Sequence, residues 1–299
     1  KWNEAGPLFR EVLEVSRETL GNRHQNTLTS IGNLGKQMEE MGDLAAAEPL
    51  YREALEVRRE TLGNRHPSTL NSVSNLGHLL LVKGELAAAE PLLREALEVQ
   101  RETLGNRHPN TLGSINNLGR LFKAKGDLAA AEPLYREALT VRRETLGNRH
   151  PNTLASINNL GTLLFTKGDL AAAEPLFREA LEVQRETLGA RHPTTLASIN
   201  NVGTLLLAKG DLAAAELLYR EALEVSRETL GDRHPSTLIS VNNLGSLLQA
   251  KGDLAPAEAL YREALVVQRE TLGNRHPNTL NSIHNLGLLL EEQGRYRGR

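Results

Sequence analysis

Apolar residues recur along the chain at spacings of three and four, which is the pattern of one helix face. In the segment from Pro67 to Pro109 they fall into two such groups, separated by Lys83-Gly84. The first group follows a proline, which suits the first turn of a helix, and the second ends at Gly105, a typical helix stop. No segment shows the alternation expected of a strand. A turn of about two or three residues between the groups therefore predicts an antiparallel helix hairpin.

This hairpin pattern repeats with a fixed period. Thr-Leu-Gly recurs every 42 residues from Thr19 to Thr271, and Asn-Leu-Gly recurs in the same register from Asn33 to Asn285. Val202 is the only change at the middle position of the second phrase. Seven copies at one period predict a stack of identical units, so we expect an all-α solenoid of about 14 antiparallel helices.

The copies divide the chain into one array of full and partial repeats. Residues 1–23 align with a second helix only, and residues 276–299 align with a first helix followed by a truncated unit. Between them lie six full repeats, at 24–65, 66–107, 108–149, 150–191, 192–233 and 234–275. Solenoids normally end in polar capping units, and neither end has that composition. We expect a fragment of a longer array or an engineered excerpt, able to associate end to end.

Small and large residues occupy fixed positions in the predicted hairpin. Gly77 in the first helix and Ala89 and Ala96 in the second recur in every complete copy. The position of Leu93 holds an aromatic residue in the other complete copies: Tyr51, Tyr135, Phe177, Tyr219 and Tyr261. This arrangement resembles the tetratricopeptide repeat, and the linking phrase Glu-Thr-Leu-Gly-Asn-Arg-His-Pro resembles the repeats of kinesin light chain. The resemblance implies a right-handed superhelix whose first helices line a concave groove for a protein or peptide.

The charge, cysteine content and apolar runs of the chain indicate which kinds of partner and which cellular compartment to expect. A net charge of -2 and a pI of 6.6 give no electrostatic reason to expect nucleic acid or an anionic membrane. The chain has no cysteine, so it has neither a disulfide framework nor a thiolate metal site. Its apolar runs are far too short to span a bilayer. The lack of cysteine is compatible with a reducing compartment, and we expect a cytoplasmic protein without a cofactor.

Differences between copies gather on one face of the first helix. The position after the helix glycine holds His78 in one copy and Arg120 in the next, and the position three residues further holds Lys123 or Phe165. These variable positions lie on one face of the first helix. The resemblance to the tetratricopeptide repeat implies that this face lines the groove. Free drift of a solvated face would explain the same variation. We favour a binding groove, because the exposed face of the second helix varies much less.

An asparagine occupies one position in all seven first helices: Asn33, Asn75, Asn117, Asn159, Asn201, Asn243 and Asn285. Asparagine inside a helix costs roughly 0.5 kcal/mol or more against alanine. Because its amide both donates and accepts, a ladder at the ~10 Å spacing of packed helices could hold an extended peptide at about every third residue. The ladder resembles those of O-GlcNAc transferase and, in part, of kinesin light chain. Alternatively, each amide bonds a neighbouring helix as buried scaffold. Free amides at Asn159 and Asn201 would favour binding.

A second set of asparagines precedes the ladder in the central copies: Asn116, Asn158, Asn200 and Asn242. Because the end copies carry other residues there, we interpret this set as tuning the groove rather than as scaffold. With His78, Arg120 and Lys123, these amides predict a preference for an extended peptide that bears a carboxylate. Phe165 is a further candidate contact on the same face.

A histidine follows arginine in every linker: His24, His66, His108, His150, His192, His234 and His276. Ligands on neighbouring units would be too far apart to share a metal ion at ~2.1 Å, so we expect these histidines to cap helices or to pack beside the proline. No nucleophile–base pair or phosphate-binding glycine loop stands out from the repeats, and we expect no enzyme activity. Two alternatives to a peptide-binding module remain: a passive, self-assembling scaffold, and a ligand-sensing arm of a larger signalling protein.

Overall fold

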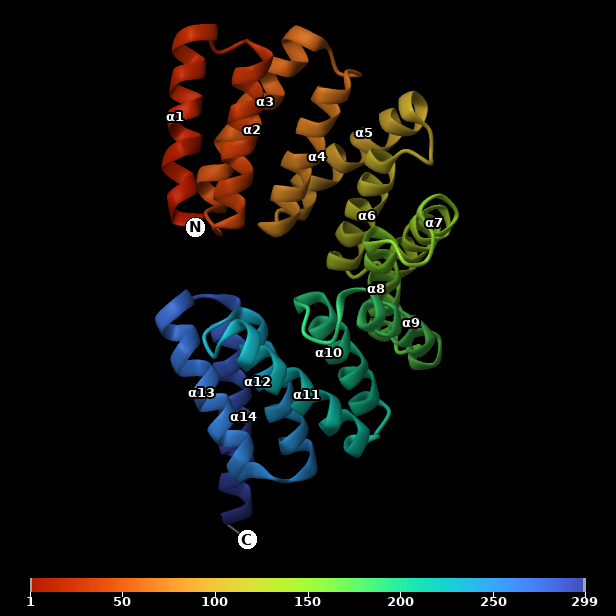
Figure 1. Cartoon of the computed structure of the whole chain (residues 1–299), viewed down its shortest axis with the longest axis vertical. Helices are drawn as coiled ribbons and strands as arrows, with labels where there is room; N and C mark the ends of the chain where they lie inside the picture. The colour runs from red at the N-terminus through yellow and green to blue at the C-terminus, as the bar shows by residue number, and fades with distance from the viewer. Residues whose placement is uncertain (1, 298–299) are drawn as a thin grey trace. The chain divides into compact units, whose positions relative to one another are not determined.

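The computed structural model describes residues 2–297 of the chain, and the side chains of residues 6–276 and 278–294 within that range (Figure 1). Over the described range the chain consists of helices joined by short turns and contains no strand. The first helices of the hairpins are α2 (Gln25–Glu40), α4 (Pro67–Val82), α6 (Pro109–Ala124), α8 (Pro151–Thr166), α10 (Pro193–Ala208), α12 (Pro235–Lys251) and α14 (Pro277–Arg297). The second helices are α1 (Trp2–Leu20), α3 (Leu44–Leu62), α5 (Leu86–Leu104), α7 (Leu128–Leu146), α9 (Leu170–Leu188), α11 (Leu212–Leu230) and α13 (Leu254–Leu272). The predicted all-α repeat solenoid is therefore confirmed.

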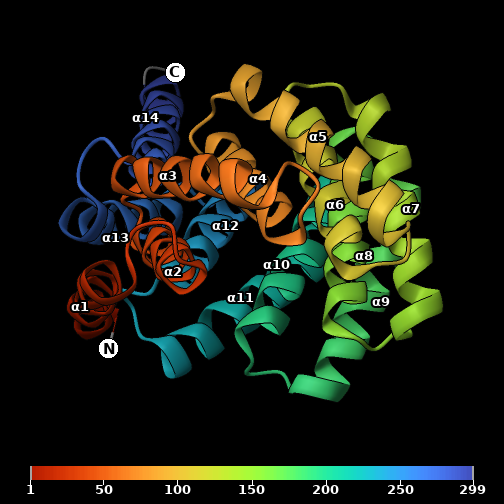
Figure 2. The same ribbon diagram turned by 90° about the horizontal axis from the view of Figure 1, so that it is seen from above.

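The helices form two compact units, Lys1–Thr145 and Leu146–Arg299. In the first unit each helix from α1 to α6 packs against the next, as Figures 1 and 2 show for α1, α2 and α3. In the second unit the same holds from α8 to α14. Successive first helices also touch, in the pairs α4 and α6, α8 and α10, α10 and α12, and α12 and α14. Each unit is thus a row of hairpins in which the first helices form a continuous layer.

The linker histidines set where the first helices begin. The Nδ1 atom of His66 accepts a hydrogen bond from the backbone N–H of Ser68 at 3.1 Å, and Pro67 follows in the first turn. The same bond forms in each copy from His24 to His276. A side-chain acceptor at this place satisfies one of the N–H groups that a helix start leaves without a partner. The expected capping role is confirmed, and the described residues contain no group of three metal-ligating side chains.

Turns at both ends of the hairpin rely on glycine and aspartate. Gly63 has φ of 83° and closes the second helix with a bond from its N–H to the Arg59 carbonyl, a conformation that favours glycine. Asp211 is the N-cap residue of the second helix α11, and its side chain accepts a hydrogen bond from the backbone N–H of Ala214 at 3.1 Å. Glu85, at the equivalent place, makes no such bond. Asp253 at the start of α13 makes none either, so the helix begins there without this bond.

The core of each hairpin forms where a glycine faces a large side chain. A Cβ atom on Gly119 would lie 2.8 Å from Cε1 of Tyr135, which is itself buried. Ala131 and Ala138 on the second helix are fully buried. The predicted role of small residues in close helix packing is therefore confirmed. No helix of the described range is long and apolar enough to cross a membrane.

Candidate functional site

The seven ladder asparagines do not share one environment. Asn33 and Asn75 are exposed, whereas the other five are half-buried. The Asn243 amide donates to Oδ1 of Asn200 at 3.2 Å, and Asn159 also has a partner. Within the described part of the chain, the remaining five side chains make no hydrogen bond: Asn33, Asn75, Asn117, Asn201 and Asn285. Of the two amides chosen to discriminate between groove and scaffold, Asn201 is therefore free and Asn159 is not.

The preceding asparagines link successive first helices. Nδ2 of Asn200 donates to Oγ of Ser240 at 3.1 Å, and Nδ2 of Asn158 lies 3.5 Å from Oγ of Ser198. Oδ1 of Asn242 accepts from Ser282 at 3.2 Å. Asn116 also has a partner. The side chains of Asn158, Asn200 and Asn242 thus each bond to the serine 40 residues ahead, which gives them a scaffold role. Their predicted tuning of the groove stays a prediction.

Two of the predicted polar positions, His78 and Arg120, meet Glu39 across successive repeats of the first unit. Nη1 of Arg120 lies 2.7 Å from Nε2 of His78, and Nδ1 of His78 lies 2.8 Å from Oε1 of Glu39. A guanidinium can only donate, so Nε2 of His78 accepts, and its Nδ1–H donates to Glu39. Tyr51 donates its hydroxyl to the other Glu39 oxygen at 3.0 Å. The structure thus joins α2, α4 and α6 through a chain of polar side chains.

The electrostatics of this chain follow from its contacts. Partial burial by itself raises the pKa of Glu39, but hydrogen bonds from His78 and Tyr51 outweigh it, so the pKa lies below its usual value. Burial and the neighbouring Glu39 carboxylate raise the pKa of the Tyr51 hydroxyl. Glu39 is therefore an anion at neutral pH and offsets part of the charge of Arg120.

Lys123 is different, because its charge is not compensated. It lies on α6 one turn after Arg120, is half-buried, and makes no ion pair or hydrogen bond through its ammonium group within the described residues. Burial lowers the pKa of Lys123. Phe165 lies half-buried on α8 in the second unit. Partial burial of a cation without an anion carries a desolvation cost that no ion pair offsets.

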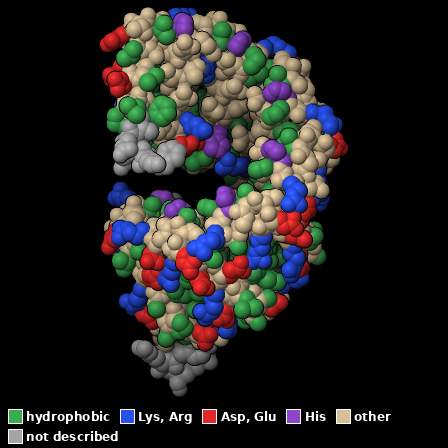
Figure 3. All heavy atoms as spheres, in the orientation of Figure 1, with side chains coloured by type: hydrophobic (Ala, Val, Ile, Leu, Met, Phe, Trp, Pro, Cys, Tyr) green, Lys and Arg blue, Asp and Glu red, His purple; other side chains and the backbone are tan. Residues whose placement is uncertain are grey.

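The second helices carry a lattice of ion pairs. Arg59 and Glu95 lie 2.6 Å apart, and Arg185 and Glu221 lie 2.7 Å apart, each pair joining one second helix to the next. Figure 3 shows basic and acidic side chains interspersed over the visible face of the second unit. Exposed pairs of this kind contribute little each. Each pair joins an arginine to the glutamate 36 residues ahead, within one unit or the other.

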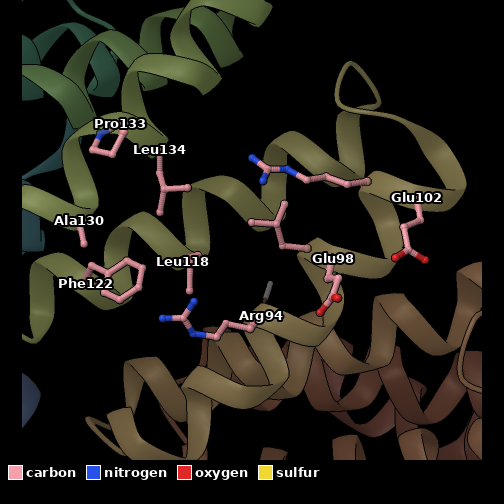
Figure 4. Close-up of a pocket in the computed structure, with 10 residues that line it drawn as sticks. Arg94, Glu98, Glu102, Leu118, Phe122, Ala130, Pro133 and Leu134 are labelled. Carbon is pink, nitrogen blue, oxygen red and sulfur yellow. The ribbon is translucent and has the colours of Figure 1, made fainter.

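A cavity of about 530 Å³ opens between α5, α6 and α7 (Figure 4). Its wall includes Leu118, Leu134 and the ring of Phe122, over which the Arg94 guanidinium lies at 5.2 Å. Sequence reasoning did not single out Phe122. The sequence nevertheless marks this position as unusual, because every other copy has leucine or methionine there. Leu80 is an example, and it is buried.

Comparison with known proteins places the repeats in context. A tetratricopeptide repeat model matches residues 1–60, 68–144, 114–186, 153–228, 196–265 and 237–297. None of the curated proteins compared with the chain matches it.

Solved structures agree with the repeat assignment. Nearly identical TPR-like repeats assigned to a kinesin light chain of Podosopora anserina are 30% identical, with a TM-score of 0.59, 69% of this chain covered and 98% of that one. BtubC (BKLC) from P. vanneervenii is 23% identical, with a TM-score of 0.60 and coverage of 78% and 92%. The apo form of RapI is 12% identical, with a TM-score of 0.60 and coverage of 91% and 99%. At these two lower identities the likeness concerns the fold alone.

Proposed function

Because the chain belongs to the tetratricopeptide repeat family, whose members are generally protein-interaction scaffolds, we propose that it binds an extended acidic peptide along its first helices. The observation that carries the proposal is the uncompensated ammonium of Lys123 beside Arg120. A carboxylate of the peptide would supply the missing anion through charge-assisted hydrogen bonds.

The amides on the same face support an extended ligand. Asn75 on α4 and Asn117 on α6 make no side-chain hydrogen bond within the described residues. Packed helices lie ~8–10 Å apart and an extended chain advances ~3.3 Å per residue. Two such amides would therefore meet the peptide backbone at about every third residue.

Loss of the two cations should abolish the preference for acidic peptides. We expect an Arg120→Ala, Lys123→Ala double variant to bind array-selected acidic peptides at least tenfold more weakly in fluorescence polarisation, because each lost charge-assisted bond is worth about 1.5 kcal/mol or more. The double variant Arg178→Ala, Arg220→Ala is the matched control, since it also removes two positive charges, from ion pairs with Glu174 and Glu216 in the second unit. Unchanged affinity of the first double variant would contradict the proposal.

A second candidate function is self-assembly into a longer scaffold, and the ion-pair lattice favours it. Within each unit the lattice pairs an arginine with the glutamate 36 residues ahead, as Arg17 does with Glu53 and Arg227 with Glu263. By that register Arg269 on α13 and Glu11 on α1 are complementary, and neither has a partner within the described residues. Both are exposed.

Exposed apolar side chains accompany these two charges. Val15 on α1 is 51% exposed and Ile283 on α14 is 37% exposed, whereas Ile157, the counterpart of Ile283 on α8, is fully buried. A second copy docking through α1 onto α14 would cover both surfaces and pair Glu11 with Arg269.

Charge reversal tests this association. We expect the mass of the 299-residue chain in sedimentation velocity to rise with concentration, and Arg269→Glu to weaken that rise several-fold. The double variant Glu11→Arg, Arg269→Glu should restore it, because the pair is re-formed with exchanged signs. A monomeric mass at every concentration would exclude the scaffold.

A further inference from the structure

A polar cavity lies between the N-terminal halves of α4 and α6, with α5 as its floor. Its volume is about 330 Å³. We call it the α4–α6 slot and define it by Asn75 on α4, Gln100 on α5, and Gly113 and Asn117 on α6. Two bonds cross it: Asn110 Nδ2 donates to Asn71 Oδ1 at 3.3 Å, and the hydroxyls of Ser74 and Ser114 lie 3.4 Å apart.

The slot is lined by neutral polar groups. None of its lining residues carries a charge, and carboxamides predominate among them. The Asn75 and Asn117 amides are available, since neither forms a side-chain bond within the described range. An Asn or Gln side chain offers both donors and acceptors. An ion entering the slot would find no opposite charge, which makes its desolvation costly.

Gln100 is the residue of the slot that most directly indicates a ligand with a hydrogen-bond donor. It is 1% exposed, and its Oε1 atom is buried without a hydrogen-bond partner. The counterpart on α3 is Arg58, which is also buried and donates through Nη1 to Oγ of Ser72 at 2.7 Å. A buried carbonyl oxygen without a donor is destabilising, and a ligand that supplies an N–H removes that cost.

Gly113 provides the space for such a ligand. A Cβ atom on this residue would meet nothing within 4 Å, so the wall of the slot is open there. The same position holds Ile239 on α12, which shows that a first helix of this chain accommodates isoleucine at that place.

We propose that the α4–α6 slot binds the side-chain carboxamide of an asparagine or glutamine in the partner peptide. The ligand N–H donates to Gln100 Oε1, and the ligand carbonyl accepts from the amide of Asn75 or Asn117. This inference rests on the proposed peptide-binding function and adds a second specificity to it. The slot takes a neutral amide, whereas Lys123 and Arg120 take the acidic residue.

Carboxylates and ammonium groups fit the slot less well than a carboxamide. A carboxylate has the same shape but no donor, so its oxygen would face the Gln100 oxygen without a proton between them. An ammonium group donates but cannot accept from the asparagine amides, and it brings an uncompensated charge. Rejection of an isosteric ligand by unpaired buried groups is typically strong.

The second unit contains a cavity of the same kind. Between α12 and α14 a space of about 190 Å³ is lined by Asn243, Asn285 and Gln268, again without a charged residue. Gln268 is 3% exposed, and its Oε1 has no partner. The glutamine carbonyl and the ladder asparagines thus recur, but Ile239 lines this second cavity at the place of Gly113, so the proposed ligand is assigned to the α4–α6 slot alone.

The test uses two isosteric probes, N-acetyl-asparagine amide and N-acetyl-aspartate amide, titrated into the full chain. The readout is the side-chain NH₂ resonance of Gln100 in ¹⁵N NMR, identified by its disappearance in Gln100→Met. We expect this resonance to shift saturably with the asparagine probe and to need at least tenfold more of the aspartate probe. Equal responses to both probes, or no response, would overturn the proposal.

A steric variant separates binding in the slot from binding elsewhere. Gly113→Ile should abolish the Gln100 shift, whereas Ala155→Ile, the same change at the equivalent position of α8, should leave it intact. A shift that survives Gly113→Ile places the probe outside the slot and refutes the assignment.

Failure of this proposal is distinguishable from failure of the peptide-binding function. If acidic peptides bind through Lys123 but the asparagine probe leaves Gln100 unchanged, the slot assignment is wrong and the peptide-binding function stands. If the probe binds the slot but no peptide binds the chain, the slot chemistry stands and the peptide-binding function is wrong.

Discussion

Gly203→Ala is expected to lower the free energy of unfolding by roughly 1–3 kcal/mol, although alanine is the better helix former. An added Cβ would lie 2.6 Å from Cε1 and 2.9 Å from Cδ1 of Tyr219. The ring cannot retreat easily, because Tyr219 is 1% exposed and its hydroxyl is held 2.9 Å from that of Thr204. The helices α10 and α11 would have to separate. Urea unfolding followed by circular dichroism measures the loss.

The control is the same substitution where nothing opposes the methyl group. Gly287 on α14 stands at the equivalent position, and a Cβ there meets nothing within 4 Å. Gly287→Ala should raise the free energy of unfolding by up to ~1 kcal/mol through helix propensity alone. In a Tyr219→Ala background, Gly203→Ala should cost little, because the ring it would strike is gone. Equal effects at Gly203 and Gly287 would mean that ring contact does not set the spacing of the hairpin.

These contacts belong to the part of the fold that the sequence predicts well. The spacing of apolar residues, the glycine opposite Tyr219 and the histidine caps are all local within one hairpin, so one period of sequence contains both partners of each contact. Repetition then supplies the same signal several times.

Contacts between repeats are harder to predict. Asn200 reaches Ser240, 40 residues ahead, and Glu39 reaches His78, 39 residues ahead. Each separation is close to one period but not equal to it, and the offset depends on how neighbouring helices are staggered. Sequence periodicity alone does not give that stagger. For that reason, the sequence did not predict the bonds of Asn158, Asn200 and Asn242 to the next first helix.

Gln100 escaped notice for another reason. It lies on the buried face of a second helix, at a position that is Arg58, Gln184, Ser226 or Gln268 in other copies. A polar residue repeated on an otherwise apolar face is a signal, because buried polar groups require partners. What the sequence could not show is that the Gln100 carbonyl has none.

Two adjacent asparagines on α10 allow scaffold and groove to be separated by measurement. Asn200→Ala should lower the free energy of unfolding by about 2 kcal/mol, because it removes the bond to Ser240 Oγ and leaves the Asn243 amide without its acceptor. Within the described part of the chain, the Ser240 hydroxyl keeps only its bond to the Ser236 carbonyl. Asn201→Ala removes no hydrogen bond within the described residues, and it should raise the same free energy by roughly 0.5 kcal/mol. Urea unfolding gives the magnitudes, and amide hydrogen exchange locates the loss at α10 and α12.

The same two asparagines also test the proposed function. An asparagine inside a helix lowers helix stability, so we expect a compensating role at each position. At position 200 the cost is offset by bonds to the next helix, so its loss should appear as instability. At position 201 no such bond offsets it, so Asn201→Ala should weaken peptide binding while the fold is retained. If Asn200→Ala were as stable as the parent, the amide would not be scaffold. If Asn201→Ala left both stability and peptide affinity unchanged, the ladder would have no role in binding.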